Sequence, residues 1–202
     1  MKRKTMQKGS VIAALDIGSS KIACFIARTL DDNGSYEVLG VGHQASAGVK
    51  NGIIVDLDKA ESAIRQAVHA AENMAAESMK GYPLREVVVN VSGLYTRSNW
   101  HSADLQVAGH EITEYDIKHT LVHAQDEALR EDSEIIHTIP MGYTIDGHSG
   151  IVDPVGMYGQ NMLADIHMVS AETAMLKNIA TCVGQSHLDI NAFCLGAYAS
   201  GL

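Results

Sequence analysis

Short apolar runs separated by polar turns open the chain. Residues 11–15 are apolar and lead into Asp-Ile-Gly-Ser-Ser at 16–20, and residues 21–29 form a second run rich in Ile, Ala and Phe. Two such runs joined by a Gly/Ser turn are typical of a β-hairpin. A third run covers residues 36–43, so the pattern predicts three consecutive antiparallel strands.

The period of the apolar positions then changes from that of a strand to that of a helix. Residues 45–52 hold two glycines and no clear period, which predicts a loop, and Asp56 is placed to cap the next helix. Between residues 57 and 79, small and aliphatic side chains recur at helical spacing, at Ala60, Ile64, Ala67, Val68, Ala71 and Ala75. We expect a long helix with a small-residue face that lies close against a sheet and ends at Gly81-Tyr82-Pro83.

Strands and helices continue to alternate in the rest of the chain. The remaining predicted strands are 86–92, a polar strand within the segment up to 107, 134–145 with an interruption at Pro140, 162–169 and 188–195. The remaining predicted helices are 113–130, with acidic residues in its first turn, and 172–183. Residues 151–160 are expected to form a Gly/Pro loop. The fold class is therefore α/β.

The order of these elements divides the chain into two blocks. Residues 1–84 and 165–202 form one α/β core, and residues 85–164 form a small inserted subdomain with its own strands and helix. A chain of 202 residues with 46% hydrophobic residues is long enough to bury a sizeable core in this way.

Charge and composition exclude several classes of protein. The net charge of −9 makes nucleic acid an unfavourable partner, because its phosphates are anionic as well. Basic residues do gather at the start, at Lys2, Arg3, Lys4 and Lys8, and we interpret them as a solvated, disordered tail. The first apolar stretch is broken by Asp16 and Lys21, which argues against a signal peptide, and no stretch is long enough for a membrane-spanning helix.

The three cysteines suggest a reducing compartment. Cys24, Cys182 and Cys194 are odd in number, lack metal-ligand spacing and lie in apolar runs. They are therefore interpreted as buried thiols in the cytosol and not as a disulfide framework.

The first turn is the strongest candidate for chemistry. A strand that ends in Asp16, turns at Gly18 and returns at Lys21 can point backbone N–H groups at a phosphate. Ser19 and Ser20 would add hydroxyl donors, and Asp16 could hold Mg²⁺ through water, since Mg²⁺ keeps much of its hydration shell. Lys21 would neutralise phosphate charge or face solvent. The alternative is an ordinary hairpin turn.

Three weaker patterns are set aside. The Gly-x-Gly-x-x-Ala motif at 40–45 lacks the helix that a dinucleotide site requires, since 45–52 is expected to be a loop. His119 and His123, with Asp116 one turn earlier, could form a metal-binding face but are better explained as an exposed polar face. The acidic residues at 126–134 are typical of a solvated surface, although they could also form a partner-binding edge.

The order of the elements and several motifs resemble the FtsA family of bacterial cell-division proteins. The resemblance rests on residues 14–21, 39–42, 48–52, 89–93, 139–146 and 153–157. It implies an actin/Hsp70-like (ribonuclease H-like) nucleotide-binding core with an inserted SHS2-like α+β subdomain. It further implies that Asp16, Gly18, Ser19, Ser20 and Lys21 bind ATP and Mg²⁺, with little or no hydrolysis expected and no catalytic residue assigned.

The same resemblance implies a role in division. The family assists assembly of the division (Z) ring, links FtsZ to the inner membrane from its cytoplasmic face and recruits later division proteins. Self-association and the later partners are assigned to 85–164, whereas FtsZ and the membrane are assigned to a second half that would follow residue 202. Because only one wall of the nucleotide cleft is then present, we expect this chain alone to bind ATP weakly or not at all.

Three other interpretations stay open at this point. The first is an enzyme of the same superfamily, such as a sugar or acetate kinase, although no acidic catalytic base other than Asp16 is evident. The second is an actin homologue of another system, such as pilus assembly or a chaperone-like ATPase. The third is a truncated, nonfunctional remnant.

Overall fold

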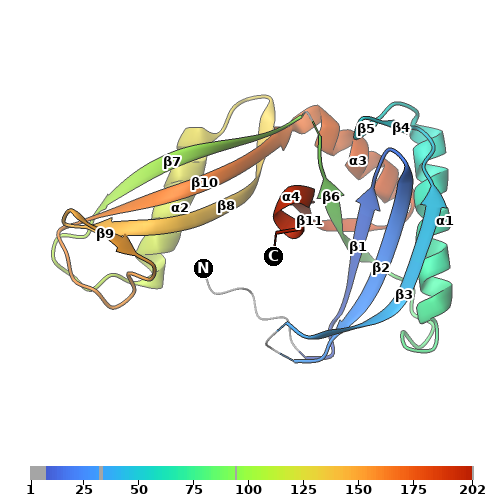
Figure 1. The fold of residues 1–202 in the computed structure, drawn as a ribbon, viewed down its shortest axis with the longest axis horizontal. Helices are drawn as coiled ribbons and strands as arrows, with labels where there is room; N and C mark the ends of the chain where they lie inside the picture. The colour runs from blue at the N-terminus through green and yellow to red at the C-terminus, as the bar shows by residue number, and fades with distance from the viewer. Residues whose placement is uncertain (1–7, 32–33, 94, 202) are drawn as a thin grey trace. The chain divides into compact units, whose positions relative to one another are not determined.

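The computed structural model describes residues 8–31, 34–93 and 95–201, and it shows two compact units (Figure 1). The inserted unit is Thr96–Glu172, and the core unit is formed by the described residues before and after it. The α/β class that the sequence predicts is confirmed.

The core unit contains a five-stranded mixed sheet in the order β11-β6-β1-β2-β3. Its elements are β1 (Val11–Ile17), β2 (Lys21–Thr29), β3 (Tyr36–Ala45), β4 (Val49–Lys50), β5 (Ile53–Ile54), α1 (Leu57–Ala75), β6 (Glu86–Val91), α3 (Thr173–Gln185), β11 (Asp189–Leu195) and α4 (Gly196–Ala199). The first three strands form the predicted antiparallel meander, and β6 and β11 run parallel to β1. The carboxyl ends of β1, β6 and β11 therefore lie at one edge of the sheet.

One face of this sheet is buried because alternate residues of each strand are aliphatic. Leu15 of β1 pairs with Cys24 of β2 on one side and with Val89 of β6 on the other, and all three side chains are fully buried. Helix α1 contacts β3 and β2, and α3 contacts α1 and β11. The helices thus cover the face to which these residues point.

The close approach of α1 to β3 explains the glycines of the 40–45 motif. A Cβ at Gly42 would lie 1.9 Å from the carbonyl oxygen of Ala67, and a Cβ at Gly40 would lie 2.2 Å from that of Ala71. The predicted small-residue face of α1 is confirmed, with alanines buried along the helix. Asp56 caps α1 as expected, since its side chain accepts a hydrogen bond from the N–H of Lys59 at 3.1 Å.

The inserted unit is a four-stranded antiparallel sheet in the order β7-β10-β8-β9, packed on one helix. Its elements are β7 (Thr96–Gln106), α2 (Glu114–Ala128), β8 (Ser133–Ile145), β9 (His148–Ile151) and β10 (Asn161–Glu172). Its core is mostly aliphatic and includes Ile112, Met162 and Ile166, none of which is exposed. Thr113 caps α2 through a complete capping box with Asp116.

Several predicted boundaries require correction. The inserted unit begins at Thr96 and ends at Glu172, whereas the sequence placed it at 85–164. β6 belongs to the core sheet because it pairs with both β1 and β11, and its valines fill the core. Its alternating pattern predicts a strand but not the sheet that the strand joins.

Smaller differences concern turns. α1 ends at Ala75 and not at 79, because the chain closes in turns in which Lys80 and Gly81 have φ of 55° and 74°. The expected loop at 45–52 contains the two-residue strand β4, and β9 was not predicted. Pro140 marks a shift in the register of β8 against β10 and not a break in the strand.

Two further observations bear on the sequence predictions. No helix within residues 8–31, 34–93 and 95–201 is both long enough and apolar enough to cross a membrane. The predicted disorder of the basic tail concerns Lys2, Arg3 and Lys4, which lie outside the described residues.

Candidate functional site: the first turn and its neighbours

The predicted phosphate-binding turn joins β1 to β2. Asp16 is half-buried near the end of β1, and Ser19, Ser20 and Lys21 are exposed at the tip. The turn is closed by a hydrogen bond from the N–H of Gly18 to the carbonyl of Lys21 at 3.0 Å. The five residues therefore lie together on one short hairpin.

Gly18 is required by space and not by an unusual backbone angle. Its φ is not in the left-handed region, but a Cβ at this position would lie 2.9 Å from the carbonyl oxygen of Lys21. A side chain would push the two strands apart at the turn. The glycine thus keeps the backbone compact and leaves its outer side open to a ligand.

The loop before α1 braces the turn. The N–H of Gly52 donates to Oγ of Ser19 at 2.9 Å, and the N–H of Ser46 donates to the carbonyl of Ser20 at 3.1 Å. Since the hydroxyl oxygen of Ser19 accepts one bond, its O–H remains able to donate to a ligand. Gly52 has a φ of 77°, which explains why a glycine stands there.

A neighbouring strand holds Asp16 in place. The side-chain N–H of Asn90 in β6 donates to Oδ1 of Asp16 at 2.7 Å. Oδ1 of Asn90 is buried and has no hydrogen-bond partner among the residues that the structure describes. Gly196 lies against this amide, because a Cβ there would be 2.8 Å from Oδ1 of Asn90. An unsatisfied buried acceptor of this kind calls for a donor, such as water or a ligand.

The geometry therefore suits an anion with an attendant cation. Asp16, Asn90 and Gly196 lie at the carboxyl ends of three parallel strands, where α/β sheets commonly bind ligands. The turn offers two hydroxyls and a lysine to phosphate oxygens, and the Asp16 carboxylate could hold a hydrated divalent cation. The donor set thus fits the phosphates and Mg²⁺ expected from the sequence, although no protein group completes a direct metal site within the described residues.

Sequence reasoning missed Asn90 and Gly196. The signal for Asn90 was present as a lone amide among the valines of the strand at 86–91. Its partner could not be found, because Asp16 lies 74 positions away in the chain.

The sites that the sequence set aside remain unsupported. His119 and His123 are exposed on α2, and Asp116 serves the helix cap. Cys24 and Cys182 are buried free thiols, as predicted, and burial raises their pKa values to about 12 and about 11. Cys194 is also free but only partly buried.

Comparisons with known proteins identify the inserted unit. The family described as the SHS2 domain inserted in FTSA matches residues 93–170. The Cell division protein FtsA of Rhizobium meliloti is 40% identical over 205 residues, which cover 97% of this chain and 45% of that protein. The FtsA of Agrobacterium fabrum is 37% identical over 211 residues, covering 100% of this chain and 46% of that protein. The chain therefore spans about half the length of the curated relatives it matches.

A solved structure supports the fold. The PilM–PilN type IV pilus biogenesis complex matches with a TM-score of 0.62 at 10% identity, over 93% of this chain and 48% of that chain. At this identity the likeness concerns the fold alone.

The strand order, the hairpin turn and the inserted SHS2 unit together define the actin-like ATPase fold. The resemblance inferred from the sequence is confirmed. The chain is similar to FtsA cell-division proteins along almost its whole length, and its inserted unit matches the SHS2 domain of FtsA.

Proposed function

We propose that this chain supplies the part of an FtsA-type cell-division protein that carries the first phosphate turn and the SHS2 interaction unit. The observation that carries the proposal is the agreement of the inserted unit and of the whole chain with FtsA relatives. In this proposal the whole protein assists Z-ring assembly, links FtsZ to the cytoplasmic face of the inner membrane and recruits later division proteins.

The turn between β1 and β2 is proposed as one wall of an ATP site. Ser19 and Ser20 would donate hydroxyl hydrogen bonds to phosphate oxygens, and Lys21 would offset their charge. Asp16, oriented by Asn90 at 2.7 Å, would hold hydrated Mg²⁺. Bound Mg²⁺ would neutralise phosphate charge, and the nucleotide would act as a structural and switching ligand with little hydrolysis.

Supporting arguments come from how firmly the turn is held. Two hydrogen bonds hold the turn, from the N–H of Gly52 to Oγ of Ser19 and from the N–H of Ser46 to the carbonyl of Ser20. Little ordering of the turn would therefore be needed when a nucleotide binds. A site with one wall still leaves most of a nucleotide in solvent. We therefore propose that the chain alone binds ATP·Mg weakly, and calorimetry that gave a clear micromolar affinity would contradict this.

A chimera tests the division role. Residues 1–202 would replace the matching part of the Agrobacterium fabrum FtsA, which aligns with 100% of this chain, in cells depleted of their own FtsA. We expect the chimera to restore division and an Asp16→Ala chimera at equal abundance to restore it poorly. Continued filamentation with a stable, folded chimera would refute the proposed function.

The alternative of a pilus-assembly actin homologue has no specific observation in its favour, since the PilM likeness extends only to the fold.

A further inference from the structure

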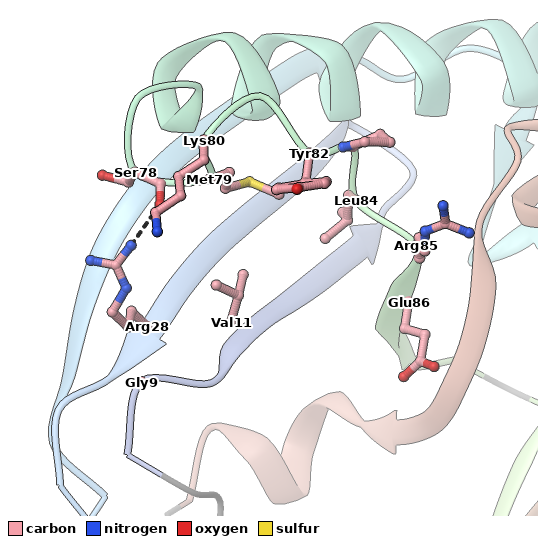
Figure 2. Close-up of a pocket in the computed structure, with 11 residues that line it drawn as sticks. Gly9, Val11, Arg28, Ser78, Met79, Lys80, Tyr82, Leu84, Arg85 and Glu86 are labelled. Carbon is pink, nitrogen blue, oxygen red and sulfur yellow. Dashed lines mark hydrogen bonds between the residues drawn. The ribbon is translucent and has the colours of Figure 1, made fainter.

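A groove lies at the end of the core sheet that is opposite the phosphate turn. It has a volume of about 760 Å³ and is bounded by the start of β1, the end of β2 and the α1–β6 connection (Figure 2). Nothing in the proposed nucleotide site uses this region, because Val11 is the first residue of β1, whereas Asp16 lies near the other end of that strand.

Hydrogen bonds fix the shape of the groove. The guanidinium of Arg28 donates to the carbonyl of Ser78 at 2.8 Å, and so ties the end of β2 to the turn after α1. Within that turn the N–H of Gly81 donates to the carbonyl of Ala76 at 3.0 Å, and that of Tyr82 to Met79 at 3.1 Å. The groove is thus formed before anything binds, which lowers the entropic cost of binding.

The lining is apolar in the middle and basic at the ends. Figure 2 shows Val11, Tyr82 and Leu84 between Arg28 on one side and Arg85 on the other. Tyr82 is 73% exposed and Val11 42% exposed, so a large apolar area faces solvent. An exposed tyrosine beside arginines is the composition of an energetic centre in protein interfaces.

The charge of the groove is opposite to that of the protein. Its lining contains three basic residues, Arg28, Lys80 and Arg85, and one acidic residue, Glu86. The whole chain, in contrast, has a net charge of −9. Arg28 also lies 3.8 Å from Glu37. Lys80 and Arg85 are exposed and have no ion-pair partner within the described part of the chain.

The same chain carries a segment of matching chemistry. Residues 126–134, at the end of α2 and the start of β8, hold five carboxylates and one arginine. Leu129 stands between the acids and is 56% exposed. Glu131 and Asp132 are exposed and have no ion-pair partner within residues 8–31, 34–93 and 95–201. The segment thus presents one apolar side chain flanked by negative charge.

We propose that the groove of one copy binds the acidic segment 126–134 of a second copy. Leu129 would pack on Tyr82, while Glu131 and Asp132 would meet Lys80 and Arg85. This inference rests on the proposed FtsA-type function, because the resemblance to that family implies self-association, and it names the two surfaces that would carry it. A concave groove with an apolar middle fits an exposed peptide segment better than a flat lipid surface.

Charge reversal provides the test, measured by sedimentation velocity on the 202-residue chain from micromolar to millimolar concentration. We expect wild type to self-associate, and Lys80→Glu/Arg85→Glu and Glu131→Lys/Asp132→Lys each to weaken association at least about tenfold, because like charges would face each other. Mixing the two variants should restore a heterodimer, since the mixture contains one intact groove and one intact acidic segment.

A matched control and a peptide probe complete the design. Lys118→Glu/Lys177→Glu changes net charge as the groove variant does, at exposed positions outside both surfaces, and should leave association unchanged. A labelled peptide of residues 124–135 should bind wild type and not the groove variant. A monomeric wild type, an equal loss in the control, or no heterodimer on mixing would overturn the proposal. Restored division by the chimera in that case would leave the proposed function standing.

Discussion

The contact between α1 and β3 yields the sharpest prediction, the substitution Gly42→Ala. A methyl group at this position would lie 1.9 Å from the carbonyl oxygen of Ala67 and 2.6 Å from the backbone nitrogen of Ala71. Ordinary van der Waals contacts begin at 3.4 Å, so the distance of 1.9 Å from the methyl carbon to the carbonyl oxygen of Ala67 is too short by about 1.5 Å. Both obstructing atoms belong to the helix backbone and cannot rotate away.

The helix must therefore move from the sheet along its whole small-residue face. Overpacking of this kind costs about 1–3 kcal/mol. The loss of glycine freedom in the unfolded chain offsets about 0.4–1 kcal/mol of that cost. For a chain of this size, each net kcal/mol lowers Tm by about 2–4 °C.

Thermal unfolding followed by far-UV circular dichroism measures the effect. Gly184→Ala is the matched control, because a Cβ there meets no atom within 4 Å and the residue lies in α3. The control should be neutral or stabilising by up to about 1 kcal/mol. The loss of glycine freedom in the unfolded chain is common to both variants, so Gly42→Ala should melt clearly below the control. If the two variants melted within about 1 °C of each other, the argument that α1 excludes a side chain at this position would be refuted.

Three further predictions concern caps and thiols. Thr113→Ala should destabilise the inserted unit by about 1 kcal/mol in urea titrations, because the capping box of α2 is lost. The hydrogen bonds from Thr113 lower the pKa of Asp116 in the folded state, so the ionised Asp116 stabilises the fold above about pH 3.9. This contribution is lost as the pH falls through the pKa of Asp116 in the folded protein. A stability that rose on acidification would contradict the prediction. Ellman's reagent at pH 8 should modify Cys194 well before Cys24, whose pKa burial raises to about 12, and equal rates would show that the core opens readily.

Most of the helices and strands could be predicted from the sequence, because the residues that determine them lie within the element itself or next to it. The hairpin at 11–29 follows from two apolar runs and a Gly/Ser turn, and the helix at 57–75 follows from alanines at helical spacing with Asp56 as its cap. The end of that helix was predicted too late, since no residue before Gly81 breaks the period. The turn is closed by hydrogen bonds that leave no mark on the pattern.

Long-range pairings could not be predicted in the same way. β6 has the alternation of any half-buried strand, and its sequence does not say that it lies between β1 and β11. The boundary of the inserted unit was therefore placed before the strand and not after it. The order of the elements along the sequence supported the resemblance to a family, but only the strand pairings show the residues at which the chain enters and leaves the inserted unit.

The candidate site shows the same division between local and distant causes. The turn from Asp16 to Lys21 could be found from sequence because all its donors are consecutive, and their role in binding stays a prediction. The partner of Asp16 could not be found, because Asn90 reaches it from a strand that is adjacent only in the folded sheet.

That strand has a further consequence for how the chain is built. β6 carries Asn90, which orients Asp16. Directly after β6, the carbonyl oxygen of Ser92 lies close to Gly52, since a Cβ on Gly52 would be 2.9 Å from it. The loop that braces the turn and the strand that orients its acid thus meet at the point where the chain leaves the core for the inserted unit. An insertion at another connection would leave the end of β6 unchanged. Because the insertion follows β6, the end of this strand both contacts the turn between β1 and β2 and leads into the SHS2 unit. We therefore expect substitutions at Asn90 to weaken nucleotide binding in the chimera without unfolding the inserted unit, whose core contains no residue of β6.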